Sequence, residues 1–135
     1  MMADGRPRIC GDQVLLPIAL FLGALQMETQ PGAATLDDVT EAPTCTLQQD
    51  HTGAHHGLVL SLAGRDTGAV WAVWTPLICV RLMVLPDCPE AREDRMRGCC
   101  QYLDHPGGHT WQVHDPIQAA AEAAVARMGL RRRTT

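Results

Sequence analysis

Two segments of this chain carry the same residue types at the same spacing, and this repetition constrains the chain more than any other feature. Both have the form Cys-x4-Asp-His-x-Gly-x-His, at residues 45–55 (unit 1) and 99–109 (unit 2). All six histidines of the chain lie within the units or just beyond them, at positions 51, 55, 56, 105, 109 and 114. Thiolate and imidazole are the ligands that zinc prefers. The repeat therefore predicts a zinc site at one or both units.

Each unit offers one cysteine and two histidines as ligands. These are Cys45, His51 and His55 in unit 1, and Cys99, His105 and His109 in unit 2. The glycine between the two histidines allows the backbone to bend toward an ion. The aspartates before the first histidines, Asp50 and Asp104, can accept a hydrogen bond from a ligand imidazole and so fix its tautomer. The alternative for both aspartates is a solvated turn position.

Structural zinc sites usually have four protein ligands, so each unit needs one more. Cys88, upstream of unit 2, completes the set Cys88, Cys99, His105 and His109. Cys10 is the only cysteine before unit 1 and completes the set Cys10, Cys45, His51 and His55. The alternative is an open Cys-His-His site in which zinc activates water, as in a metal-dependent hydrolase. Glu90 and Glu122 are available acids for that chemistry, but their spacing places neither near a metal-bound water.

Unit 1 resembles the Cys-x-Leu-x-x-x-His-x-Gly-x-His unit of zinc-ribbon-like modules in small, uncharacterised proteins of high-GC bacteria and their phages. Cys45, Leu47, His51, Gly53 and His55 match that pattern in full. In unit 2 the pattern is matched by Cys99, His105, Gly107 and His109, with Trp111 following and Gln101 in place of leucine. The resemblance covers these two segments and implies metal binding without indicating an activity.

The composition fits one domain spanning residues 1–135. A chain of 135 residues that is 46% hydrophobic can bury a core of its own. Its net charge of −4 gives no general attraction to phosphate backbones, and its basic run is confined to residues 131–133. We therefore expect no binding to nucleic acids.

The N-terminal apolar stretch bears on whether the protein is secreted or stays in the cytoplasm. Residues 14–25 follow Arg6 and Arg8 and superficially resemble the core of a signal peptide. Asp12 and Pro17 disagree with that interpretation, and the stretch is too short to cross a bilayer. We expect a cytoplasmic protein without a membrane partner, in which cysteine more often binds metal than forms disulfides. The alternative is a secreted protein stabilised by disulfides among Cys 10, 45, 79, 88, 99 and 100.

The hydrophobic pattern predicts an α+β fold. It indicates a small antiparallel sheet made of a hairpin over 58–74 and strands near 77–85 and 110–113. Residues 69–74 are apolar on both faces, which indicates a central strand. We expect an N-terminal helix over 13–27 capped by Asp12, and an Ala-rich helix from Pro116 to about 128, capped by Asp115 and stopped by Gly129. The charged segment 89–97 is also compatible with a helix.

Three further side chains have simple interpretations. Cys79 lies in a predicted strand and is expected to be buried. Trp71 and Trp74 are expected to lie in the core or at a subunit interface, and a homodimer would cover an exposed strand face. The leading interpretation is a small zinc-binding module with a structural, interaction or regulatory role and a protein partner or second copy, rather than an enzyme.

Overall fold

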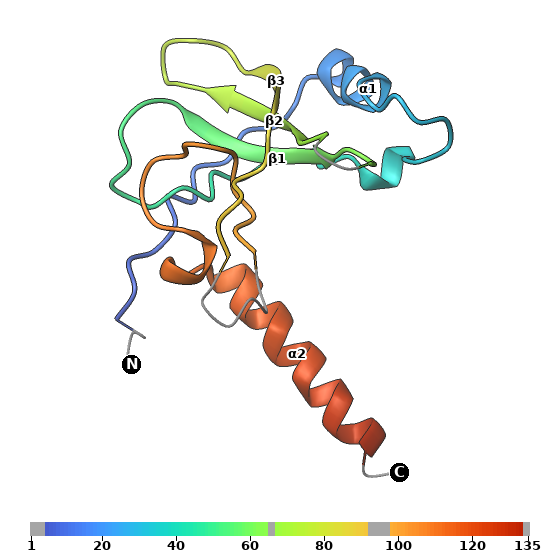
Figure 1. The fold of residues 1–135 in the computed structure, drawn as a ribbon. Helices are drawn as coiled ribbons and strands as arrows, with labels where there is room; N and C mark the ends of the chain where they lie inside the picture. The colour runs from blue at the N-terminus through green and yellow to red at the C-terminus, as the bar shows by residue number, and fades with distance from the viewer. Residues whose placement is uncertain (1–4, 65–66, 92–97, 134–135) are drawn as a thin grey trace.

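The computed structural model describes residues 5–64, 67–91 and 98–133 (Figure 1). In chain order the elements are α1 (Ile18–Gln26), the 3-10 helix η1 (Leu36–Asp38), β1 (His55–Ser61), β2 (Ala69–Trp74), β3 (Arg81–Leu85), the 3-10 helix η2 (Thr110–Gln112) and α2 (Pro116–Arg133). The predicted α+β class is confirmed. None of the described helices is both long and apolar enough to span a membrane.

The sheet has three antiparallel strands in the order β1-β2-β3. Every residue of β2 is buried, which confirms the central strand expected from its two apolar faces. The predicted hairpin is also present, with Leu58 opposite Trp71 and His56 opposite Val73. Strand β1 begins at His55, so the last predicted ligand of unit 1 is the first residue of the sheet.

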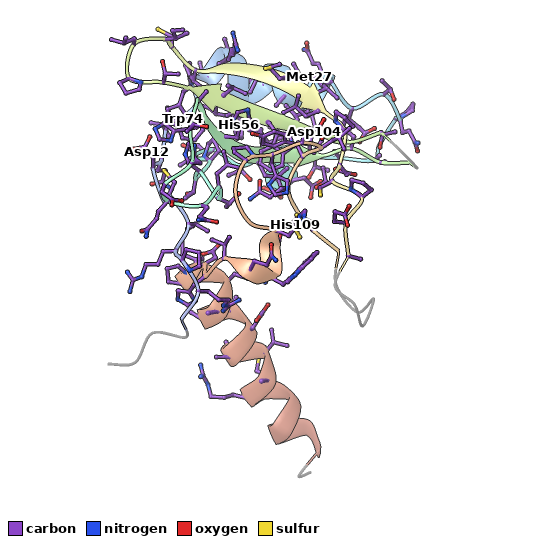
Figure 2. All side chains as sticks on the ribbon, turned by 60° about the vertical axis from the view of Figure 1, so that its left-hand side comes forward. Asp12, Met27, His56, Trp74, Asp104 and His109 are labelled. Atoms are coloured by element: carbon purple, nitrogen blue, oxygen red, sulfur yellow. The ribbon has the colours of Figure 1, made fainter. Side chains whose placement is uncertain are left out.

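The two faces of the sheet are covered by different parts of the chain. Successive strand residues point to opposite faces, so Trp71 and Val73 share one of them. The Tyr102 ring of unit 2 packs edge-on against Trp71, with ring centroids 5.3 Å apart. Helix α1 lies on the other side of the sheet, and its Ala24 is fully buried (Figures 1 and 2). The loops of unit 2 therefore pack directly on the core.

Two strand predictions are corrected. Residues 110–112 form η2 instead of a strand, because the Gln112 side chain accepts a hydrogen bond from the His109 N–H and closes a local turn (2.9 Å). The strand predicted near 77–85 begins only at Arg81. Before it, Thr75 Oγ1 accepts hydrogen bonds from the N–H groups of residues 77 and 78 (3.2 and 3.0 Å), which favours a turn. Cys79 follows this turn and is exposed, contrary to the prediction that it is buried.

Helix α1 is shorter than predicted. It begins at Ile18 after Pro17, because the preceding residues are extended and pair with residues 41–47. The N–H groups of Val14 and Leu16, for example, donate to the carbonyls of residues 43 and 41 (3.2 and 2.9 Å). Asp12 lies in this N-terminal arm, residues 7–16, and does not cap the helix.

Helix α2 begins at Pro116 as predicted. The Asp115 carboxylate accepts hydrogen bonds from the N–H groups of Ile117 and Gln118 (3.0 and 3.3 Å). The helix then continues through Gly129 to Arg133, because glycine costs a helix only about 1 kcal/mol and nothing downstream forces a turn. Figure 1 shows α2 projecting away from the sheet. In the predicted helical segment 89–97, residues 92–97 lie outside the described residues, and residues 89–91 are not helical.

Candidate metal centres

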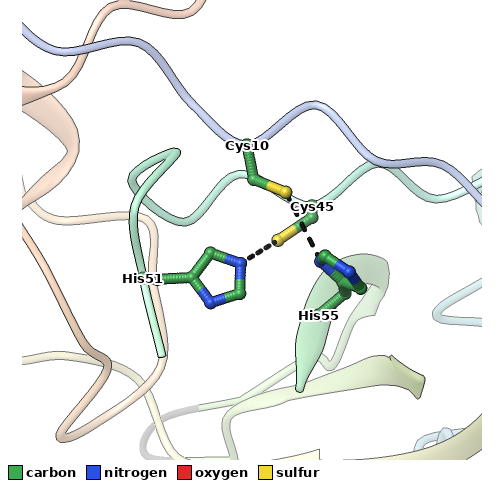
Figure 3. A group of neighbouring side chains, drawn as sticks. All are labelled: Cys10, Cys45, His51 and His55. Carbon is green, nitrogen blue, oxygen red and sulfur yellow. Dashed lines mark hydrogen bonds between the residues drawn. The ribbon is translucent and has the colours of Figure 1, made fainter. Parts of the chain in front are cut away.

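Unit 1 and the N-terminal arm form one cluster of ligand atoms, here called site 1 (Figure 3). It consists of Cys10, Cys45, His51 and His55, whose ligand atoms all lie within 4.8 Å of one another. The Cys45 Sγ lies 3.5 Å from His51 Nε2, and the Cys10 Sγ lies 3.4 Å from His55 Nδ1. Cys45 is fully buried and the other three are half-buried.

Unit 2 and the segment after β3 form a second cluster, here called site 2. It consists of Cys88, Cys99, His105 and His109, within the same 4.8 Å limit. The Cys99 Sγ lies 3.4 Å from His105 Nε2, and the Cys88 Sγ lies 3.7 Å from His109 Nδ1. The two imidazole nitrogens, His105 Nε2 and His109 Nδ1, are 3.3 Å apart. The pairing of each cysteine with Nε2 or Nδ1 is the same as in site 1.

These distances fit a tetrahedral metal ion. With bonds of about 2.05 Å to nitrogen and about 2.3 Å to sulfur, a tetrahedral zinc site separates its ligand atoms by about 3.4 to 3.8 Å. The five observed separations run from 3.3 to 3.7 Å. Both clusters therefore bring two sulfur and two nitrogen donors within 4.8 Å of one another, with these five separations at tetrahedral spacing, and both can bind a metal.

The backbone repeats around both sites, and this repetition includes the upstream cysteines. The Cys10 N–H donates to the carbonyl of Leu47 (2.6 Å), as the Cys88 N–H donates to that of Gln101 (2.9 Å). Three further hydrogen bonds at site 1 each have an equivalent at site 2. The N–H groups of Gln49, Cys45 and His51 donate to the carbonyls of Arg8, Asp12 and Gln48, respectively. At site 2 the N–H groups of Leu103, Cys99 and His105 donate to the carbonyls of Pro86, Glu90 and Tyr102 in the same order. Cys10 and Cys88 are thus structurally equivalent, although they precede their units at very different distances along the chain.

The glycine inside each unit has the conformation that the turn requires. Gly53 has φ 83° and Gly107 has φ 77°, in the left-handed region that side chains rarely adopt. This turn brings the second histidine of each unit back toward the first. The rings of His51 and His55 are 5.3 Å apart, and those of His105 and His109 are 5.2 Å apart.

Backbone carbonyls, instead of the predicted aspartates, orient the first histidines. The Nδ1 of His51 lies 3.2 Å from the Thr52 carbonyl, and the Nδ1 of His105 lies 3.2 Å from the Pro106 carbonyl. A proton on Nδ1 leaves Nε2 free to bind a metal. Asp50 instead accepts a hydrogen bond from a neighbouring side chain (2.9 Å), and Asp104 occupies a turn at φ 65°. The turn interpretation of both aspartates agrees with the structure.

Asp12 has a position that the sequence did not reveal. One of its carboxylate oxygens lies 3.6 Å from His55 Nε2 and accepts a hydrogen bond from the Trp74 indole (2.7 Å). The other nitrogen of the same imidazole faces Cys10, so Asp12 stands behind a candidate ligand. Its position two residues after Cys10 was the only available signal. That signal has meaning only once the arm is known to pair with unit 1.

Burial sets the charge state of two of the thiols. It raises the pKa of Cys45 to about 11, although the N–H groups of His56 and Leu47 hydrogen-bond to its sulfur and oppose the shift. Burial also raises the pKa of Cys88 and lowers the pKa of His105. Without a metal these two thiols are therefore protonated at neutral pH, and an ion must displace their protons to bind.

The two remaining cysteines lie outside both sites. Cys79 and Cys100 are exposed, and Cys99, rather than its neighbour Cys100, lies in site 2. All six cysteines have free thiols. In comparisons with protein-family models, with curated proteins and with solved structures, nothing matches this chain.

Proposed function

We propose that this chain is a small zinc-binding module that holds one structural zinc ion in each of its two sites. The observation that carries the proposal is that each cluster holds two cysteine and two histidine donors within 4.8 Å of one another. Tetrahedral sites with two sulfur and two nitrogen ligands are typical of zinc. The half-buried position of both clusters, with a neutral His105, also suits a divalent ion that is bound by thiolates.

Four protein ligands per site support a structural role over a catalytic one. A catalytic zinc keeps a position open for water or substrate. Here Cys10 and Cys88 lie within 4.8 Å of the Cys-His-His sets of the units and would supply the fourth ligands. A hydrolytic reaction would have to displace one of them, so the open-site hydrolase is the weaker candidate.

Each ion would join segments that the sheet alone does not hold. Site 1 connects the N-terminal arm to unit 1 and to the first residue of β1, and site 2 connects the segment after β3 to unit 2. Structural zinc contributes roughly 10 kcal/mol or more to the folded state, comparable with the whole stability of a small domain. The ions would thus hold these segments together in addition to the backbone hydrogen bonds between them.

The projecting helix α2 supports an interaction role for the module. Ile117, Val125 and Met128 are exposed on it, at 71%, 63% and 54% of their surface. Burying such side chains against a second copy would stabilise a dimer. Sedimentation equilibrium of the zinc-loaded chain is expected to show a dimer that Val125→Glu weakens. A monomer at all concentrations would contradict self-association.

Elemental mass spectrometry of the purified chain tests the zinc proposal. We expect two zinc ions per chain, and one in each of the variants Cys45→Ser and Cys99→Ser. The matched controls are Cys79→Ser and Cys100→Ser, which remove exposed thiols outside both sites and are expected to keep two ions. A metal-free protein with six reactive thiols would overturn the proposal, as would a loss of zinc from either control.

A further inference from the structure

The two units contact each other directly, through residues that lie between the ligands of each site. Gln48 lies between Cys45 and His51, two of the proposed ligands of site 1. Its Oε1 accepts a hydrogen bond from the N–H of Gly108 (3.0 Å), the residue before the last ligand of unit 2, His109. One hydrogen bond therefore joins a loop between two ligands of site 1 to a loop between two ligands of site 2.

Gln48 also lies against the turn that brings the histidines of unit 2 together. A Cβ on Gly107, the glycine that bends this turn, would lie 2.8 Å from the Gln48 Cβ. The Gln48 Nε2 donates to the Asp50 carboxylate (2.9 Å), which directs its Oε1 toward Gly108. The amide of Gln48 is thus bonded at both ends, and its position and the turn of unit 2 constrain each other.

Unit 2 makes the corresponding contact with unit 1. Tyr102 holds the position in unit 2 that Gln48 holds in unit 1. Its ring stacks on that of His56, with centroids 4.4 Å apart and an angle of 29° between the planes. His56 directly follows His55, the last proposed ligand of unit 1. Each unit therefore contacts a residue next to the second histidine of the other.

A third contact uses a buried amide. Gln101 of unit 2 is 5% exposed, and its equivalent in unit 1 is Leu47. A buried amide destabilises the fold unless it is hydrogen-bonded. The Gln101 Nε2 donates to the Thr46 carbonyl and lies equally close to the Thr46 Oγ1 (both 2.9 Å). Because Thr46 directly follows Cys45, this bond also ends beside a proposed ligand of site 1.

These contacts make the order of one unit depend on the order of the other. An ion bound at one site would fix the loop between its ligands, and fixing a loop costs conformational entropy. Through the contacts, the same ion would order groups that the second ion must otherwise order by itself, so the second ion would bind more tightly. The effect is reciprocal, since coupling between two binding sites acts equally in both directions.

We propose that the two sites bind zinc cooperatively, and that Gln48 and Gln101 carry the coupling between them. This inference rests on the proposed function and adds a regulation to it. The chain passes from empty to fully loaded over a narrow range of zinc concentration, with few chains that hold one ion. The expected coupling is about tenfold in affinity, within the usual range for coupled sites.

Native mass spectrometry of the full, metal-free chain mixed with one equivalent of zinc measures the coupling. At this half-saturation, two independent sites leave at least half of the chains with a single ion, whatever their separate affinities. Tenfold coupling between sites of equal affinity lowers that fraction to about one quarter. A singly loaded fraction of one half or more would overturn the inference.

The variants Gln48→Met and Gln101→Leu remove two of the contacts separately. Methionine keeps the length of the Gln48 side chain, and leucine is the residue that unit 1 has at the position equivalent to Gln101. Each variant should raise the singly loaded fraction toward one half. Gln49→Met is the matched control, because the side chain of this neighbouring glutamine is exposed, and it should keep the fraction of the unmodified chain. An unchanged fraction in both variants, or an equal rise in the control, would contradict the role of these contacts.

The zinc content at saturation separates this inference from the proposed function. Elemental mass spectrometry should find two zinc ions per chain in all three variants, because none of the substituted glutamines is a proposed ligand. A chain that takes up two ions independently contradicts only the cooperativity and leaves the proposed zinc sites standing. A chain that binds no zinc contradicts the proposed function itself.

Discussion

Asp12 connects site 1 to the core of the protein. Its carboxylate contacts both His55 and the Trp74 indole. Trp74, which is labelled with Asp12 in Figure 2, belongs to the central strand. Carboxylates in this position orient a ligand imidazole and raise its basicity, and their removal commonly weakens metal binding 10- to 100-fold. The carboxylate of Asp12 would therefore act on a metal ion bound at site 1 through His55, without contacting the ion.

The variant Asp12→Asn is expected to weaken zinc binding at site 1 by about 10- to 100-fold and to leave site 2 unchanged. The amide oxygen of asparagine can still accept the Trp74 hydrogen bond, so the change removes mainly the negative charge. Competition with a chromophoric chelator measures both affinities. Asp50→Asn is the control, because Asp50 contacts a glutamine and no ligand. Equal affinities in the two variants would show that Asp12 has no such role.

The protonated thiols predict that zinc binding releases protons. Cys45, with a pKa raised to about 11, and Cys88, with a raised pKa, each bind a proton at pH 7 when no metal is present. Calorimetry in buffers of different ionisation enthalpy should show at least about one proton released per zinc, and an affinity that falls as the pH falls. Zinc binding that is independent of pH between 6 and 8 would contradict this expectation.

The raised pKa of Cys45 also makes the stability of the metal-free protein depend on pH, in the opposite direction to its zinc affinity. Since the pKa of Cys45 is raised on folding, its neutral form is favoured in the folded state. Stability is then lost as the pH rises from the ordinary value of 9.0 through about 11.

Part of the candidate site could be predicted from residue types alone. The Cys-His-His sets follow from the repeat, because both copies keep the same spacing and the glycine that bends the turn. The equivalence of Cys10 and Cys88 could not be deduced in this way, since it depends on backbone pairing between segments that are distant in sequence. The role of Asp12 and the carbonyls behind His51 and His105 depend on the same tertiary arrangement.

At the scale of elements, β1 and the segment of unit 1 around Cys45 lie unusually close together. Cys45 pairs with Gly57 in an isolated bridge, and a Cβ on Gly57 would lie 2.8 Å from the Pro43 Cβ and 3.0 Å from the Thr44 backbone. Only glycine lets this segment approach the strand that begins with His55. The position of the Cys45 thiol therefore depends on Gly57.

We expect Gly57→Ala to lower the free energy of unfolding of the zinc-loaded chain by about 1 to 3 kcal/mol, because the methyl group collides with backbone atoms. Gly23→Ala is the matched control. Gly23 lies in α1 with nothing within 4 Å of its added Cβ, so the control should gain about 0.5 to 1 kcal/mol. Denaturant titrations measure both values. Equal stabilities would show that the close approach has no energetic importance.

Local patterns predicted elements well where local interactions decide the structure. The hairpin, the buried strand β2 and the Asp115 cap of α2 are such cases. Residues 13–16 have an apolar pattern that suits a helix, but their backbone pairs with residues 41–44 instead. Such pairing depends on contacts that a local pattern does not contain, and a cap residue such as Asp12 can then serve another purpose.

The whole molecule combines a small sheet with long loops that bound metal ions would tie together at the two sites. If each site binds zinc far more tightly than the working concentration, removal of both ions should lower the melting temperature by about 20 °C or more. Thermal unfolding before and after treatment with a strong chelator measures this change, and Cys100→Ser should behave like the unmodified chain. The same melting temperature in both states would show that the sites do not support the fold.

The most direct test of two closed, structural zinc sites is X-ray absorption spectroscopy at the zinc edge on the full, zinc-loaded chain. The account predicts an average of two sulfur ligands at about 2.3 Å and two imidazole nitrogens at about 2.0 Å per zinc. One sulfur with three nitrogen or oxygen ligands, including a water, would contradict it. Such a result would mean that Cys10 and Cys88 leave the metal open, as an enzyme requires.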